Sequence, residues 1–87
     1  MRAEMSKKEK LIKRLKSKPT DFTYDDAESL LLSLGFAKFK AGKTGGSRVK
    51  FMYSSTALML HKPHPRNVLE PYQVNKIIKF LKRMELI

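Results

Sequence analysis

The chain has 87 residues, of which 41% are hydrophobic, and a formal net charge of +11 at pH 7. This length is enough for one modest hydrophobic core, and it excludes a cofactor domain joined to a separate substrate domain. The sequence contains no cysteine, which excludes disulfide frameworks and thiolate metal sites and fits a reducing compartment. No apolar run is long enough to span a bilayer, and no signal-peptide pattern is present, so we expect a cytoplasmic protein.

The positive charge is spread unevenly along the chain. Residues 1–18 carry eight Lys and Arg against two Glu, residues 19–35 carry four acidic residues and no cation, and residues 36–87 carry eleven Lys and Arg against two Glu. A small basic domain commonly binds a polyanion, because each neutralised phosphate releases condensed counterions. This favours a nucleic-acid partner over two alternatives: lysines that only maintain solubility, and a membrane surface.

The first expected element is a helix over residues 5–17. Its narrow apolar stripe consists of Leu11, Ile12 and Leu15. Pro19 ends the helix, since a residue that precedes proline avoids helical backbone angles. We therefore divide the chain into a basic N-terminal helix or extension, residues 1–18, and a main domain, residues 19–87.

A second helix is expected to begin after Thr23. This threonine is a suitable N-cap, and Asp26 follows it at the spacing of a capping box. Gly35 is placed to end the helix. The apolar residues between them follow helical spacing: Ala27, Leu30, Leu31 and Leu34. The acidic cluster at the helix start is thus explained by capping and by the helix dipole rather than by a metal site.

A nucleotide-binding P-loop is excluded for the glycine-rich stretch that follows. Gly42-Lys43-Thr44 resembles the end of that motif, but the glycine required five positions earlier is Ala37, and no helix follows. Apolar and basic residues alternate instead, as is typical of a strand. We expect strands over residues 36–40, 47–53 and 57–60, joined by turns over residues 43–46 and 54–56.

A closing helix is expected from Pro71, a residue that suits the first helical position. Its buried stripe should consist of Val74, Ile77, Ile78 and Leu81. The order α-α-β-β-β-α predicts an α+β fold with a three-stranded antiparallel sheet. The last two helices should cover one face of that sheet, which leaves the other face for solvent or a ligand.

Both histidines, His61 and His64, lie just before the closing helix. Metal binding would lack Cys or carboxylate ligands nearby, and simple packing or solvation of the rings is the plain alternative. Their functional interpretation is acid–base chemistry on RNA, whose own 2′-OH can attack the adjacent phosphate without any cofactor. Cations to stabilise the crowded negative charge are available in Arg48, Lys50, Lys62 and Arg66. No nucleophile elbow supports a serine triad, and no separated carboxylate pair supports glycoside hydrolysis.

Four segments resemble the HicA-type toxins of bacterial toxin–antitoxin pairs. They are LLLSLGF (30–36), GGSRVKF (45–51), LMLHKPHP (58–65) and LEPYQVNKIIKFL (69–81). The resemblance covers roughly residues 20–86 and implies a double-stranded-RNA-binding-like α-β-β-β-α fold. It also implies an RNA-cleaving toxin that acts on messenger RNA and is neutralised by a HicB-type antitoxin. Together with the cofactor-free chemistry described above, this predicts a metal-independent ribonuclease.

The sequence departs from this family in one position. The family commonly has Gly-Ser-His in the turn after the first strand, where this chain has Gly46-Ser47-Arg48. Arginine stays protonated and cannot act as an ordinary general base, although it can grip two phosphate oxygens at once. The chemistry then falls to His64, which aligns with a second family histidine, or to His61; otherwise the toxin is weakened, or the chain binds RNA without cleaving it.

For RNA binding, the glycine turn should let the backbone approach the ligand, with phosphates held by nearby cations. The expected binding residues are Lys43, Gly46, Ser47, Arg48, Lys50, Lys62 and Arg66. Recognition of an RNA duplex through phosphates and 2′-OH groups would suit these side chains and the basic closing helix. A DNA-binding domain is the third alternative, but no helix-turn-helix pattern supports it.

Overall fold

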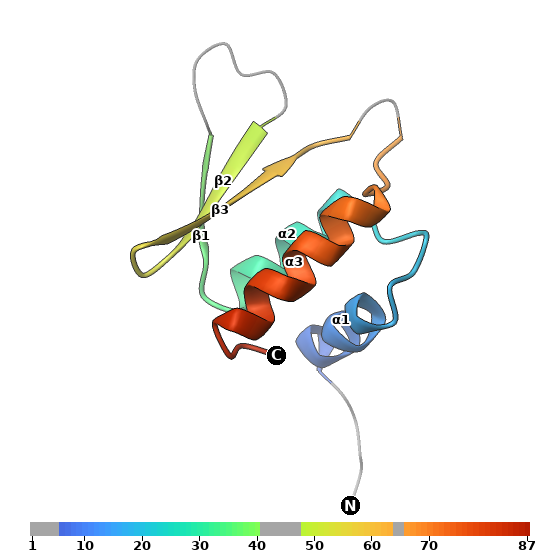
Figure 1. Cartoon of the computed structure of the whole chain (residues 1–87), viewed down its shortest axis with the longest axis horizontal. Coiled ribbons are helices and arrows are strands. Elements are labelled where there is room, and N and C mark those ends of the chain that lie inside the picture. Colours follow the sequence, from blue (N-terminus) through green and yellow to red (C-terminus); the bar gives the residue numbers. More distant parts are fainter. Residues whose placement is uncertain (1–5, 41–47, 64–65) are drawn as a thin grey trace, which may run out of the picture.

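In the part of the chain that it describes, the computed structural model consists of three helices and three strands (Figure 1). The structure describes residues 6–40, 48–63 and 66–87. In chain order the elements are α1 (Lys7–Lys16), α2 (Tyr24–Ser33), β1 (Ala37–Lys40), β2 (Arg48–Tyr53), β3 (Thr56–His61) and α3 (Pro71–Arg83). The predicted order is confirmed, and the predicted bounds are correct to within a few residues. Thr56, predicted as part of a turn, is instead the first residue of β3.

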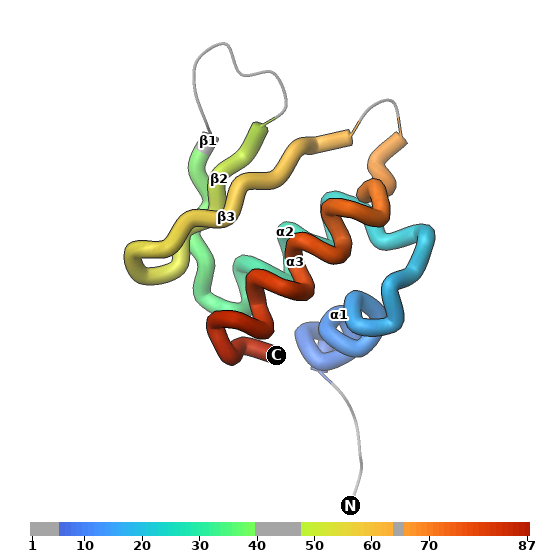
Figure 2. The backbone as a smooth tube through the Cα atoms, in the orientation of Figure 1, coloured from blue at the N-terminus to red at the C-terminus, as the bar shows by residue number. Residues whose placement is uncertain are grey.

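The strands form one antiparallel sheet in the order β1-β2-β3, with β2 in the centre. Helices α2 and α3 lie on the same side of this sheet (Figure 1). The α1 helix packs against both of these helices, away from the sheet, and so forms a third layer (Figures 1 and 2). This confirms the predicted α+β fold with helices on one face and an additional N-terminal helix.

Local sequence signals account for the helix ends. At the start of α2, the Thr23 hydroxyl accepts from the Asp26 N–H at 3.0 Å, and the Asp26 carboxylate accepts from the Thr23 N–H at 3.2 Å. This is the predicted capping box. After α2, Gly35 has a φ of +104°, and a Cβ there would lie 3.3 Å from the Tyr53 ring. Both observations explain why glycine occupies that position.

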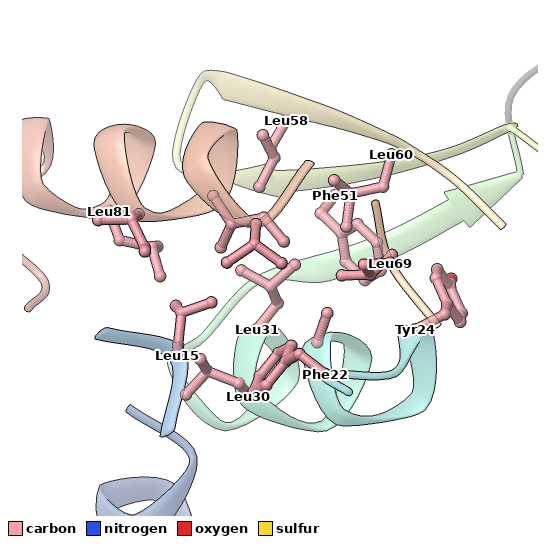
Figure 3. Close-up of a cluster of buried hydrophobic side chains, with 14 of the residues drawn as sticks. Leu15, Phe22, Tyr24, Leu30, Leu31, Phe51, Leu58, Leu60, Leu69 and Leu81 are labelled. Carbon is pink, nitrogen blue, oxygen red and sulfur yellow. The ribbon is translucent and has the colours of Figure 1, made fainter. Parts of the chain in front are cut away.

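The core lies between the sheet and the helices. Strand side chains Phe51, Leu58 and Leu60 point toward the helices, where they meet residues such as Leu31 and Leu81 (Figure 3). The predicted stripe of α3 is entirely buried. The α1 helix joins the same core through Leu11 and Leu15. These two buried leucines show that α1 is docked against the rest of the protein.

A short backbone pairing connects the loop before α2 to the loop before α3. Thr23 and Val68 form an isolated antiparallel bridge. Next to it, the Tyr24 N–H donates to the Asn67 carbonyl at 2.9 Å, and the Leu69 N–H donates to the Phe22 carbonyl at 2.8 Å. This pairing ties the segment after β3 to the start of α2. Among the described residues, no helix is long and apolar enough to cross a membrane.

Candidate nucleic-acid interface

The alternation of side chains along the strands gives the sheet a second face, which we call the open face. It consists of the strand positions that point away from α2 and α3. The register places them in three rows: Ala37, Met52 and Ala57; Phe39, Lys50 and Met59; and Arg48 with His61. None of these eight side chains is buried, whereas Val49, Phe51, Leu58 and Leu60, which alternate with them, are.

Arg48 and His61 are direct partners in the β2–β3 register. Directly opposed residues in an antiparallel pair have Cβ atoms about 5 Å apart, so the guanidinium and the imidazole can reach one small ligand. Lys50 lies two residues further along β2 on the same face. Among the described residues, neither Arg48 nor Lys50 forms a salt bridge. The structure thus brings together three of the predicted site residues.

Two side chains from α3 hold the outer edge of β3. The His61 backbone N–H donates to the Gln73 amide oxygen at 3.1 Å, and the Lys76 ammonium donates to the Met59 carbonyl at 2.8 Å. Gln73 is only 3% exposed and is the one buried polar side chain among the described residues. Sequence analysis missed its role, although a glutamine within a buried apolar stripe was a usable signal.

Two other predicted site residues lie away from the open face. The Lys62 ammonium is 5.6 Å from the centre of the Tyr24 ring, within the range of a cation–π interaction. Because Tyr24 is a buried residue of α2, this contact directs Lys62 toward the helix side. Arg66 lines a cavity of about 430 Å³ that includes Glu70 and no residue of β1 or β2. The structure therefore does not place these cations beside Arg48.

The remaining predicted site residues are Lys43, Gly46, Ser47 and His64, which lie outside the described residues. Their predicted roles stay predictions. Within the described ranges, no group of three or more His, Cys, Asp or Glu side chains is arranged as a metal-binding cluster.

The acidic cluster serves to dock α1. Arg14 donates to Asp21 at 2.9 Å and to Asp26 at 3.0 Å, so one cation of α1 bridges two carboxylates at the start of α2. Burial alone would raise the pKa of Asp26, but hydrogen bonds from Arg14 and Thr23 outweigh it and hold the pKa below its ordinary value. Sequence analysis found the capping role of Asp26 and missed its pairing with Arg14.

The Tyr24 hydroxyl is buried and has no hydrogen-bond partner among the described residues. Burial, together with the nearby carboxylates of Glu28 and Asp25, raises the pKa of this phenol. Tyr24 is therefore neutral at physiological pH. Its ring supports Lys62, and its hydroxyl is not placed to exchange protons with a ligand on the open face.

A sheet with one open basic face and a family match together define the class of protein. A protein-family model described as the HicA toxin of bacterial toxin-antitoxin matches residues 24–85 of the chain. The chain therefore belongs to the HicA toxin family, and the match covers α2 through α3 while α1 precedes it. Comparisons with curated proteins and with solved structures gave no match.

Proposed function

We propose that this protein is a HicA-type toxin that binds messenger RNA on the open face and cleaves it without a metal ion. The observation that carries the proposal is the direct opposition of Arg48 and His61 on an exposed sheet face, with Lys50 in the adjacent row. These side chains supply a phosphate grip, a second cation and an imidazole that can act as an acid or a base.

The proposed reaction is an internal transfer within the RNA. The 2′-oxygen bonds to the adjacent phosphorus while the bond from phosphorus to the 5′-oxygen breaks. His61 takes the proton of the 2′-OH or gives a proton to the departing 5′-oxygen, and Arg48 and Lys50 stabilise the charge on the phosphate oxygens. His64, three positions along the chain, is the candidate for the second proton transfer. The products are a 2′,3′-cyclic phosphate and a 5′-hydroxyl.

Cleavage of an end-labelled messenger-like RNA in EDTA tests the nuclease function. We expect cutting by the wild type, loss of cutting in His61→Ala and His64→Ala, and fragments that a kinase can phosphorylate at the 5′ end without prior phosphatase treatment. Lys10→Ala, on the exposed side of α1, is the control that should cut normally. Wild-type protein that binds the RNA and leaves it intact in every buffer would contradict the nuclease function.

A second candidate is an RNA-binding module that does not cleave. Arg48 favours it, because the resemblance implies a histidine at this position and arginine is not a general base. Arg48→His separates the two candidates: a gain of cleavage from an inactive wild type would support the non-cleaving module, and an active wild type would exclude it.

We also propose that the partner implied by the toxin–antitoxin family is a HicB-type antitoxin that covers the basic open face. Charge complementarity supports this assignment, because the eight strand positions of the open face contain two cations and no carboxylate. Antitoxin added to the RNA complex should release the RNA. Simultaneous binding of both partners would contradict a shared surface.

A further inference from the structure

Phe39 is an exposed aromatic residue of the open face, on the edge strand β1. Its side chain is 49% exposed, while Phe22, Phe36 and Phe51 are at most 4% exposed. The core therefore does not require Phe39. On the open face, the register places Phe39 in one row with Lys50 and Met59.

The register places Phe39 at one end of a path across all three strands. Phe39 on β1 is opposite Lys50 on β2, Arg48 lies two residues along β2, and His61 on β3 is opposite Arg48. Neighbouring strands are about 4.8 Å apart, and positions two residues apart along a strand are separated by about 7 Å. The path therefore presents an aromatic ring, two cations and an imidazole in one continuous line across the open face.

From this arrangement we propose that the open face takes an unpaired RNA segment, with Phe39 as the platform on which one base stacks. The proposal rests on the RNA-binding function proposed above and specifies the substrate as single-stranded. In a duplex the base faces are covered by neighbouring pairs, and recognition relies on phosphates and 2′-OH groups. Unpaired bases expose their faces, and aromatic side chains beside cations are the common means of binding them.

The chemistry of the face favours RNA over a protein segment as the ligand of Phe39. Lys50 lies between Phe39 and Met59 in the same row, so an apolar protein surface covering this row would bury an ammonium ion without a counter-charge. A nucleotide matches both neighbours, because its base covers the ring and its phosphate pairs with the cation. Single-strand binding is the alternative to the duplex recognition that the sequence suggested, and the binding experiment below distinguishes the two.

Binding of a short RNA that contains the fluorescent base 2-aminopurine tests the proposal. We expect fluorescence quenching by the wild type, and tighter binding of the single strand than of the same RNA annealed to its complement. In Phe39→Leu we expect loss of the quenching and an affinity reduced roughly tenfold or more. The salt dependence should not change, because the phosphate contacts are retained.

Tyr72→Leu is the matched control. Tyr72 is 63% exposed and lies on α3, so this variant removes an exposed aromatic residue away from the open face and should bind and quench like the wild type. Thermal unfolding should be unchanged in both variants, since neither ring is part of the core. Equal behaviour of the wild type and Phe39→Leu, or tighter binding of the duplex, would overturn the single-strand proposal.

Two outcomes separate this proposal from the function on which it rests. If the wild type binds neither single-stranded nor duplex RNA at low salt, the RNA-binding function itself fails. If Phe39→Leu retains RNA binding and quenching but loses affinity for the antitoxin, the ring belongs to the protein interface and only the stacking proposal is overturned.

Discussion

The two faces of the sheet are built from the same strands but serve different purposes. Toward the helices, Phe51 and Leu60 are fully buried, while on the open face Arg48 and His61 are exposed. Neighbouring residues of one strand thus alternate between positions buried in the core and exposed positions that we propose contact a ligand. Substitutions on the open face should therefore change ligand binding without unfolding the protein, because the exposed side chains are not part of the buried core.

The strongest test of this comparison uses the same residue type on both faces. Phe51→Ala should lower the free energy of unfolding by about 3–5 kcal/mol, because it removes a fully buried ring and leaves a cavity. Phe39→Ala, on the open face, should lower it by less than about 1 kcal/mol. Urea denaturation followed by circular dichroism measures both values. Similar losses in the two variants would show that the open face is also part of the stabilising core.

An intermediate loss of stability is expected where α3 is hydrogen-bonded to the edge strand β3. Gln73→Met removes the acceptor of the His61 backbone N–H. We expect a loss of about 1 kcal/mol, because water can reach the exposed end of β3 and partly replace the bond. Asn75→Met, which changes an exposed amide of the same helix, is the control and should alter stability by less than about 0.5 kcal/mol. Equal losses of stability in Gln73→Met and Asn75→Met would show that Gln73 does not anchor β3.

The smallest expected effect distinguishes a structural arginine from a functional one. Arg14→Gln breaks the pairing with Asp21 and Asp26 and should cost under about 1 kcal/mol near pH 7, because these charges are partly solvated. Arg48→Gln should leave stability unchanged. Urea denaturation of both variants at neutral pH measures these values. A loss of stability confined to Arg48→Gln would show that Arg48, and not Arg14, is the structural arginine.

The cost of Arg14→Gln should also depend on pH. The pKa of Asp26 is lowered in the folded protein, so its stabilising contribution is present above the ordinary pKa of about 4 and is lost as pH falls through the folded value. The difference in the free energy of unfolding between the wild type and Arg14→Gln should therefore become smaller as the pH falls. A difference that grows below about pH 4 would contradict the pairing.

Local signals allowed most of the fold to be predicted from the sequence. The capping box at Thr23, the glycine at residue 35 and Pro71 at the start of α3 each act through neighbouring residues, and all were confirmed. The alternation in β2 also correctly separated Arg48 and Lys50 from the buried side chains. These features depend on periods of two or about 3.6 residues, which a single sequence displays directly.

Contacts between distant segments could not be predicted in this way. The opposition of Arg48 and His61 depends on the register of two strands, and the bonds from Gln73 and Lys76 to β3 depend on how α3 packs beside the sheet. The docking of α1 through Arg14 is also non-local. For the same reason the sequence could not show that Lys62 lies against the Tyr24 ring or that Arg66 lines a cavity beside Glu70.

The most direct test of the open face as an RNA site is the salt dependence of RNA binding in two matched double variants. Arg48→Gln/Lys50→Gln removes two charges from the open face, and Lys10→Gln/Lys13→Gln removes two exposed charges from α1. We predict that the slope of log affinity against log salt falls by about 1.4 for the first variant and hardly changes for the second. Equal changes in the two variants, or a larger change for the α1 variant, would contradict the account.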